Sequence, residues 1–251
     1  MSPLETLPGA ASAAAVFLLA GMVKGVIGLG LPTFSMALLA LWMPPAQAAA
    51  LLVVPSLVTN AWQAGPLGSL GALLRRLGGL QLGVFAGTVG GVLAWGPPAG
   101  RLGAGLLGLA LIAYAAWGLA GRRLAVPARG PGWAGAAVGL VTGLLTALTG
   151  VFVIPAVPWL QSLGLEKDEL VQAMGLCFTT STVALALGLA AVGSYAPAGL
   201  MASLGMLPAA GLGMVAGQWL RRRLPLALFR RCFFIALALL GAWMVSRAAM
   251  A

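Results

Sequence analysis

The sequence has very few charged side chains, and acids and histidine are the scarcest of them. Only 7% of the 251 residues are charged, with 14 lysines and arginines, 4 aspartates and glutamates and no histidine, whereas 61% are hydrophobic. A soluble domain usually carries about 25% charged residues. Because so little polar surface cannot cover a water-soluble globule, we expect lipid to be the solvent for most of the chain.

The scarcity of acids, histidine and cysteine argues against a membrane-embedded enzyme. An intramembrane zinc site needs a cluster of His, Cys or carboxylate ligands, and a proton relay needs buried carboxylates. Cys177 and Cys232 lie in separate apolar runs, where a cysteine is usually a small buried hydrophobe. We therefore expect no catalytic residue, no metal and no cofactor. The four acids all fall at predicted segment ends: Glu5, Glu166, Asp168 and Glu169.

The basic residues give the chain a net charge of +10. In a soluble protein this excess would suggest a nucleic-acid partner. Here the basic residues form short clusters at the ends of apolar runs, which is typical of the cytoplasmic loops of membrane proteins. Nucleic acid is therefore not an expected partner.

Eight apolar runs predict an all-α polytopic membrane protein, since a membrane helix needs about 20 apolar residues. The first and fifth runs are too long for one ordinary span, and glycine and proline interrupt them at residues 28–32 and 149–155. Backbone broken at membrane depth is tolerated only where protein or water covers it. We therefore expect both runs to be broken or re-entrant helical hairpins. The eight runs are residues 9–42, 46–65, 77–95, 102–120, 133–163, 170–192, 198–220 and 228–246.

The order of features repeats between the two halves of the chain. Residues 47–51 align with residues 172–176 at an offset of 125. We expect two repeats of four runs each, residues 1–125 and 126–251. The glycines have the small-xxx-small spacing of closely packed membrane helices. They align as Gly21 and Gly25 with Gly139 and Gly143 at an offset of 118, and as Gly87 and Gly91 with Gly213 and Gly217 at an offset of 126.

The distribution of Lys and Arg predicts the orientation. With Lys24 left out because it lies within a run, the two faces carry 6 and 7 basic residues if all eight runs cross fully. If the interrupted runs instead enter and leave on the same side, the faces carry 11 and 2, which the positive-inside rule favours. Both termini are then periplasmic, and the halves are inverted repeats as in many carriers. The eleven are Arg75, Arg76, Arg122, Arg123, Arg129, Lys167, Arg221, Arg222, Arg223, Arg230 and Arg231, and the two are Arg101 and Arg247.

The interrupted segments predict a substrate site at the hairpin tips. The first break starts a new half-helix near Thr33, and a helix N-terminus presents unpaired N–H groups and partial positive charge to an anion. The second break is expected to offer the same at Thr149. The alternative is that both kinks serve packing alone. The tip residues assigned to substrate binding are Gly28, Gly30, Pro32, Thr33, Thr149 and Gly150.

Polar clusters in the following runs are expected to face these tips. The first half has Ser56 followed by Thr59 and Asn60, and the second has four hydroxyl side chains at residues 179–182. Hydroxyls and amides can replace the hydration shell of an anion, although Ser and Thr also bond their own helix or join helices together. The cluster residues assigned to the site are Ser56, Asn60, Thr179, Thr180 and Ser181.

Lys24 is the only charged residue inside the first apolar run. Because burying an unpaired charge is unfavourable, an intramembrane basic residue is a functional candidate. We expect Lys24 to raise the positive potential at the site. A lysine that snorkels from a hairpin tip into water is an equally open alternative.

The sequence resembles the sulfite exporter TauE/SafE family in two glycine-rich segments and in its duplicated four-run plan. The segments are residues 21–32 and residues 139–143, the second of which leads to Thr149, Gly150 and Pro155. The resemblance covers nearly the whole chain. It implies transport, usually export, of small sulfur-containing or carboxylate-type anions such as sulfite or sulfoacetate. Members of this family usually have a glycine triplet at each break, whereas this sequence has Gly28 and Gly30 in one half and only Gly150 in the other. This difference affects the expected substrate more than the expected fold.

Together these features predict a secondary transporter that moves a small anion across a bacterial inner membrane by alternating access. An anion channel is the alternative within membranes, and a membrane-embedded enzyme is a more distant one. The expected partners are the small anionic substrate and the lipid bilayer, with a homodimer left open.

Overall fold

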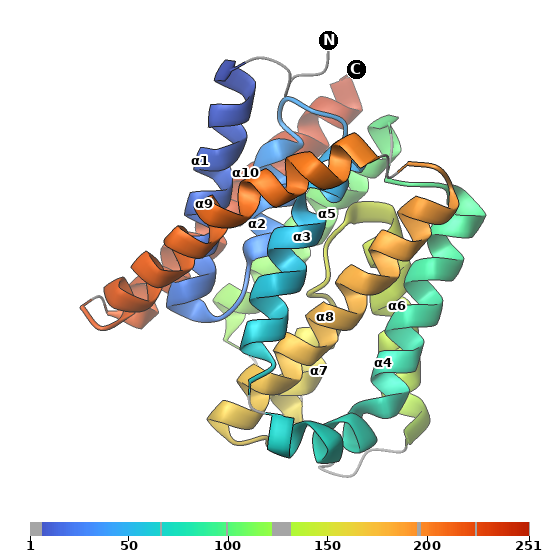
Figure 1. Cartoon of the computed structure of the whole chain (residues 1–251), viewed down its shortest axis with the longest axis vertical. Coiled ribbons are helices and arrows are strands. Elements are labelled where there is room, and N and C mark those ends of the chain that lie inside the picture. The colour runs from blue at the N-terminus through green and yellow to red at the C-terminus, as the bar shows by residue number, and fades with distance from the viewer. Residues whose placement is uncertain are drawn as a thin grey trace.

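The computed structural model (Figure 1) describes residues 7–65, 67–98, 100–121, 132–194, 197–223 and 225–250. Over these ranges the chain forms ten α-helices and no strand, which confirms the all-α prediction. Six of them, α1, α4, α5, α8, α9 and α10, are long and apolar enough to cross a membrane. The helices are α1 (Leu7–Ile27), α2 (Leu31–Leu39), α3 (Pro45–Gln63), α4 (Leu67–Trp95), α5 (Gly100–Ala120), α6 (Gly132–Thr149), α7 (Ala156–Ser162), α8 (Lys167–Ala191), α9 (Pro197–Arg221) and α10 (Leu226–Met250).

Both long apolar runs are broken where the sequence predicts. Helix α1 ends just before Gly28, and α2 begins just after Gly30, with φ values of 76° and 103° at the two glycines. L side chains rarely adopt this backbone region, so glycine is what permits the break. Helix α2 has 9 residues, about 14 Å of length, which is too short to cross a bilayer core of about 30 Å. In the second half Gly150, with a φ of 70°, ends α6, and α7 has only 7 residues.

Helix α3 is held in place at a proline. Pro55 has no N–H, so the carbonyl of Leu51, four residues earlier, lacks its usual helical partner. The Ser203 hydroxyl of α9 donates to this carbonyl at 2.7 Å and accepts from the N–H of Val54 at 3.0 Å. A side chain of the second half therefore replaces the missing bond of the first half and fixes α3 just before its polar residues.

Helix α4 begins earlier than the sequence predicts. It starts at Leu67, whereas the apolar run starts at Leu77, so the placement of Arg75 and Arg76 between segments was wrong. The first turns of α4 run across the lower end of the molecule before the helix turns upward (Figure 1). The Arg76 guanidinium donates to the carbonyl of Leu163, the C-cap residue of α7, at 3.2 Å. This contact anchors the first turns of α4, which consist mainly of Leu, Gly and Ala, to the second hairpin.

Glycines bring two pairs of helices into backbone contact. A Cβ on Gly213 of α9 would lie 2.0 Å from the carbonyl oxygen of Leu18 in α1, and a Cβ on Gly139 of α6 would lie 2.2 Å from that of Leu80 in α4. Only glycine permits such an approach, as the small-xxx-small pattern predicts. The helices of each pair run parallel, because positions further along one helix meet positions further along the other.

Two other contacts join helices that run in opposite directions. In α5 and α10, Gly108 lies against Gly241, and Gly118 lies against Phe234. In α3 and α8, the Gln63 amide donates to the carbonyl of Val171 at 3.3 Å, while Asn60 contacts α8 further along, at Thr182. In each of these pairs the two helices are five places apart in the order of helices along the chain.

The contacts correct one predicted alignment. Gly83 and Gly87 of α4 contact α6 as Gly213 and Gly217 of α9 contact α1. These contacts give an offset of 130, whereas the sequence alignment of Gly87 and Gly91 predicted an offset of 126. Because Gly83, Gly87 and Gly91 share one spacing, the sequence alone offers two registers, and only the facing helix selects one.

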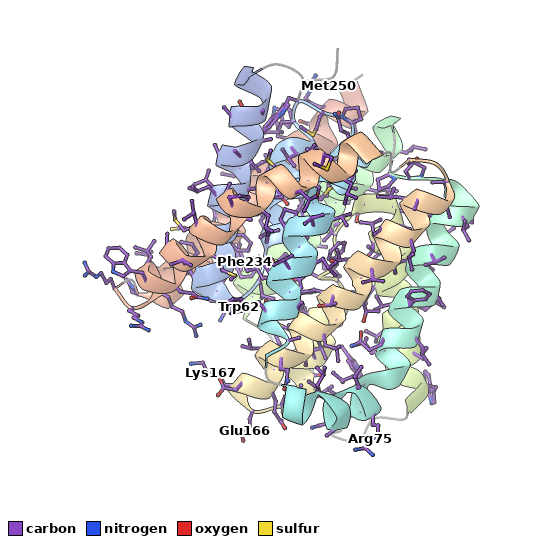
Figure 2. The ribbon with its side chains drawn as sticks, viewed as in Figure 1. Trp62, Arg75, Glu166, Lys167, Phe234 and Met250 are labelled. Carbon is purple, nitrogen blue, oxygen red and sulfur yellow. The ribbon has the colours of Figure 1, made fainter. Side chains whose placement is uncertain are left out.

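The predicted division between repeats at residues 125 and 126 lies outside the described residues, as do Arg122, Arg123 and Arg129. Figure 2 places Arg75, Glu166 and Lys167 at the lower end of the molecule and Met250 at the upper end, where helix α1 also begins.

Candidate functional site

Lys24 lies in the last turn of α1, and its side chain is buried, with 4% exposure. Its ammonium group donates hydrogen bonds to Thr59 Oγ1 at 3.2 Å and to Asn60 Oδ1, both on α3. A snorkelling lysine would place its amine in water, so this alternative is wrong. The lysine instead joins the broken hairpin to the polar part of α3.

The Asn60 side chain extends this contact to the second half of the protein. An ammonium group can only donate, so the amide oxygen must face Lys24 and the amide nitrogen must face away. That nitrogen donates to Thr182 Oγ1 of α8 at 3.4 Å. The hydroxyls of Thr59 and Thr182 each donate to their own helix backbone at 2.7 Å, to Pro55 and Phe178, which fixes their orientation. Lys24, Thr59, Asn60 and Thr182 form what we call the lysine cluster.

The lysine cluster has a positive charge and, over the described ranges, no matching negative one. Both recorded acceptors of the Lys24 ammonium are uncharged. The acids within the described ranges are Glu166, Asp168 and Glu169, all exposed around the start of α8 at the lower end of the molecule (Figure 2). Since a buried ion usually has a counter-charge, this arrangement suits a bound anion.

Ser56 supplies a second sign of a missing ligand. Its side chain has 0% exposure, and its hydroxyl has no hydrogen-bond partner among the described residues. It lies one helical turn before Asn60 on the same face of α3. A buried hydroxyl without a partner is unfavourable unless something else bonds it, so Ser56 has a free donor and acceptor beside the lysine cluster.

The first hairpin tip lies beside the lysine cluster. The amide N–H of Gly28 donates to the Lys24 carbonyl at 2.7 Å, and the Gln63 side chain donates to the Gly28 carbonyl at 2.8 Å. Pro32 and Thr33 are buried in the first turn of α2, whose N-cap residue Gly30 supplies no side-chain hydrogen bond. The predicted residues Lys24, Gly28, Gly30, Pro32 and Thr33 thus occupy one continuous segment.

The second tip does not have the predicted geometry. Helix α7 begins at Ala156, so no helix starts at Thr149 and Gly150, and the prediction of a helix N-terminus there was wrong. The Gly150 N–H donates to the Thr146 carbonyl at 2.8 Å, and the Val151 N–H donates to Thr149 Oγ1 at 3.2 Å. Both N–H groups are therefore hydrogen-bonded within the second hairpin, where residues 150–155 form the break between α6 and α7.

The predicted hydroxyl cluster of α8 points largely to its own backbone. Thr179 and Ser181 donate to the carbonyls four residues earlier, at 2.7 and 3.0 Å. Thr180 is half-buried, and no hydrogen bond joins it to the lysine cluster. The residue of this group that contacts Asn60 is Thr182. Thr182 and Thr59 were recognised as polar residues of the two clusters but were not assigned to the site.

Comparison with protein families agrees with the resemblance seen in the sequence. Residues 13–244 match the family model described as sulfite exporter TauE/SafE. Comparisons with curated proteins and with solved structures give no match. The matched range runs from the second turn of α1 to the last two turns of α10. It includes the lysine cluster, both hairpin tips, four of the six apolar helices of membrane-spanning length in full, and most of the other two. The chain therefore belongs to the sulfite exporter TauE/SafE family of multi-pass membrane proteins.

Proposed function

We propose that the protein is a secondary transporter that exports a small anion, such as sulfite, a sulfonate like sulfoacetate or a related organic anion, across a bacterial inner membrane. One observation carries the proposal: within the described part of the chain, the buried Lys24 ammonium is bonded only to neutral oxygens of Thr59 and Asn60. An anion bound there supplies the missing counter-charge, and the hydroxyl of Ser56 supplies a further hydrogen bond.

The mechanism that we propose is alternating access by two inverted repeats, residues 1–125 and 126–251. The helix contacts support it. If each of helices α1 to α5 corresponds to the helix five places later, α1 corresponds to α6 and α4 to α9. The α1–α9 contact then corresponds to the α6–α4 contact, and the α3–α8 and α5–α10 contacts each correspond to themselves. The antiparallel direction of these last two pairs is what an inverted repeat requires. With the basic lower end in the cytoplasm, both termini are periplasmic.

The lysine cluster is suited to such a mechanism because it joins the halves. Asn60 of the first repeat contacts Thr182 of the second, so relative movement of α3 and α8 changes the site itself. The glycines that border the first hairpin tip give the backbone near Lys24 a place to bend.

The proposal is tested by counterflow in proteoliposomes. Vesicles loaded with unlabelled sulfite are diluted into a trace of labelled sulfite, and the assay is repeated with sulfoacetate and with acetate. We expect transient, saturable accumulation of label for at least one of these anions. Flux that does not saturate and shows no counterflow would identify a channel, and no flux of any anion would overturn the proposal.

Replacing Ser56 with alanine tests the site without removing a structural bond. The hydroxyl has no partner among the residues that the structure describes, so we expect Ser56→Ala to melt at the same temperature as the wild type or slightly higher. Loss of one hydrogen bond to a charged ligand is expected to raise KM by roughly tenfold, from a bond of about 1.5 kcal/mol. Ser162→Ala is the control, since the Ser162 hydroxyl is bonded to the Trp159 carbonyl and is not part of the lysine cluster; we expect its KM to be unchanged. An unchanged KM in Ser56→Ala would remove this residue from the site.

A further inference from the structure

Apart from the lysine cluster, the protein has a polar cavity between the two hairpins and the lower ends of three helices. It is a cavity of about 490 Å³ with walls from α5, α7, α8, α10 and the first hairpin tip. Lys167 and Phe234 both line it, and Figure 2 places Lys167 at the lower end of the molecule and Phe234 nearer its middle. The cavity therefore runs inward from the end that carries the basic residues.

Among the described residues, the two charged side chains that line this cavity are both cations. Lys167 comes from the start of α8 and Arg230 from the start of α10, and none of the described lining residues is an acid. The acids Glu166, Asp168 and Glu169, which neighbour Lys167 in the chain, are exposed and do not line it. Cations gathered on the walls of a concave site raise the local concentration of anions.

Tyr114 adds an uncharged donor to this lining. Its side chain has 1% exposure, and its hydroxyl has no hydrogen-bond partner among the described residues. The amide of Gln161 on α7 also lines the cavity. A tyrosine hydroxyl, a carboxamide, an ammonium and a guanidinium are together a donor set for an oxyanion.

Leu29 connects the cavity to the lysine cluster. It lines the cavity at the tip of the first hairpin, between Gly28 and Gly30, and the N–H of Gly28 is bonded to the carbonyl of Lys24. The cavity thus reaches the hairpin tip that directly follows the helical turn carrying Lys24. Both glycines that flank Leu29 have the positive φ that permits a local change of backbone direction.

We propose that this cavity is an access vestibule in which Lys167 and Arg230 capture the oxyanion before it passes the Leu29 tip to the lysine cluster. The inference rests on the proposed transport function, and it adds a second anion-binding position on the route. The vestibule takes organic sulfonates and carboxylates as well as sulfite, because apolar side chains such as Phe234 share its walls with the cations.

Charge-selective thiol labelling tests the vestibule without any transport measurement. The exposed Cys232 is first replaced by serine, while the buried Cys177 stays. Gln161→Cys is then treated with 2-sulfonatoethyl methanethiosulfonate, which is itself an organic sulfonate, and with its trimethylammonium analogue. We compare the ratio of the anionic to the cationic reaction rate at two positions. This ratio is expected to be roughly tenfold higher at Gln161→Cys than at Ser162→Cys, a neighbouring position that does not line the cavity. Leu165→Cys, a second lining position, serves if Gln161→Cys does not fold.

The cations are then removed in the same background. Lys167→Gln and Arg230→Gln are each expected to lower the anionic preference severalfold, and the double variant is expected to abolish it, whereas Arg231→Gln, which does not line the cavity, leaves it unchanged. A preference that persists in the double variant would overturn the vestibule. Because labelling needs no flux, this failure is distinct from a failure of counterflow, which would overturn the transport function even if the labelling preference is found.

Discussion

Replacing Lys24 with methionine is expected to abolish saturable anion transport. Methionine has a similar length and keeps the apolar part of the side chain, but it removes the only charge of the lysine cluster. Truncating one partner of a buried, hydrogen-bonded charge pair weakens binding by about 2–5 kcal/mol, which is at least thirtyfold in affinity. We therefore expect counterflow of the transported anion to fall to the level of empty vesicles.

The control for this variant is Arg231→Met, which removes the same charge from an exposed position. Both variants are compared with the wild type by size-exclusion profile and by melting temperature in detergent. Normal transport by a well-folded Lys24→Met variant would show that the lysine holds α1 to α3 and does not bind substrate.

Asn60→Asp tests the site if Lys24→Met loses both transport and the folded peak. This variant keeps the size of the side chain and supplies Lys24 with its own carboxylate. We expect Asn60→Asp to fold and to transport poorly, because the carboxylate takes the place of the anion; normal transport by this variant would contradict the assignment.

Adding a single methyl group at Gly213 is expected to have the largest effect on stability. A Cβ there would lie 2.0 Å from the carbonyl oxygen of Leu18, a distance at which the backbones of α9 and α1 must separate. Overpacking costs about 1–3 kcal/mol even where flexible side chains can yield. For a domain of this size we expect Gly213→Ala to lower the melting temperature in detergent by roughly 5–10 °C.

The control lies two residues away on the same helix. Nothing lies within 4 Å of a Cβ on Gly211, and the substitution Gly211→Ala favours the helix by up to about 1 kcal/mol. We expect Gly211→Ala to melt at or slightly above the wild-type temperature. On the other side of the proposed symmetry, Gly87→Ala places its Cβ 2.4 Å from the Leu140 carbonyl, and Gly90→Ala meets nothing. Equal melting temperatures for Gly213→Ala and Gly211→Ala would contradict the close α1–α9 contact.

The general architecture was predictable from local features of the sequence. The shortage of charge requires lipid as the solvent, and runs of about 20 apolar residues require helices. The break at Gly28–Gly30 was equally predictable, because glycine with positive φ is a property of the chain at that point alone. The prediction failed at α4, where the helix includes Arg75 and Arg76, and Arg76 donates to the carbonyl of the C-cap residue of α7.

The candidate site was only partly predictable, for a reason that the hydroxyl residues of α8 make clear. Residues 179–182 look alike in sequence, but neighbouring positions on a helix point about 100° apart. Which of them meets Asn60 depends on how α8 is rotated against α3, and the structure selects Thr182. In the same way the sequence offered two registers for the glycines of α4, and contact with α6 selects one.

The sequence by itself determined the solvent, the helical class, the two glycine breaks and the presence of one lysine in an apolar run, since each depends on composition or on residues adjacent in the chain. The tertiary structure decided that Lys24 is buried against α3, that Asn60 contacts the second half at Thr182, and that the Ser56 hydroxyl has no partner among the described residues. These facts depend on the rotation and register of helices that are distant in sequence, and packing between whole helices sets both.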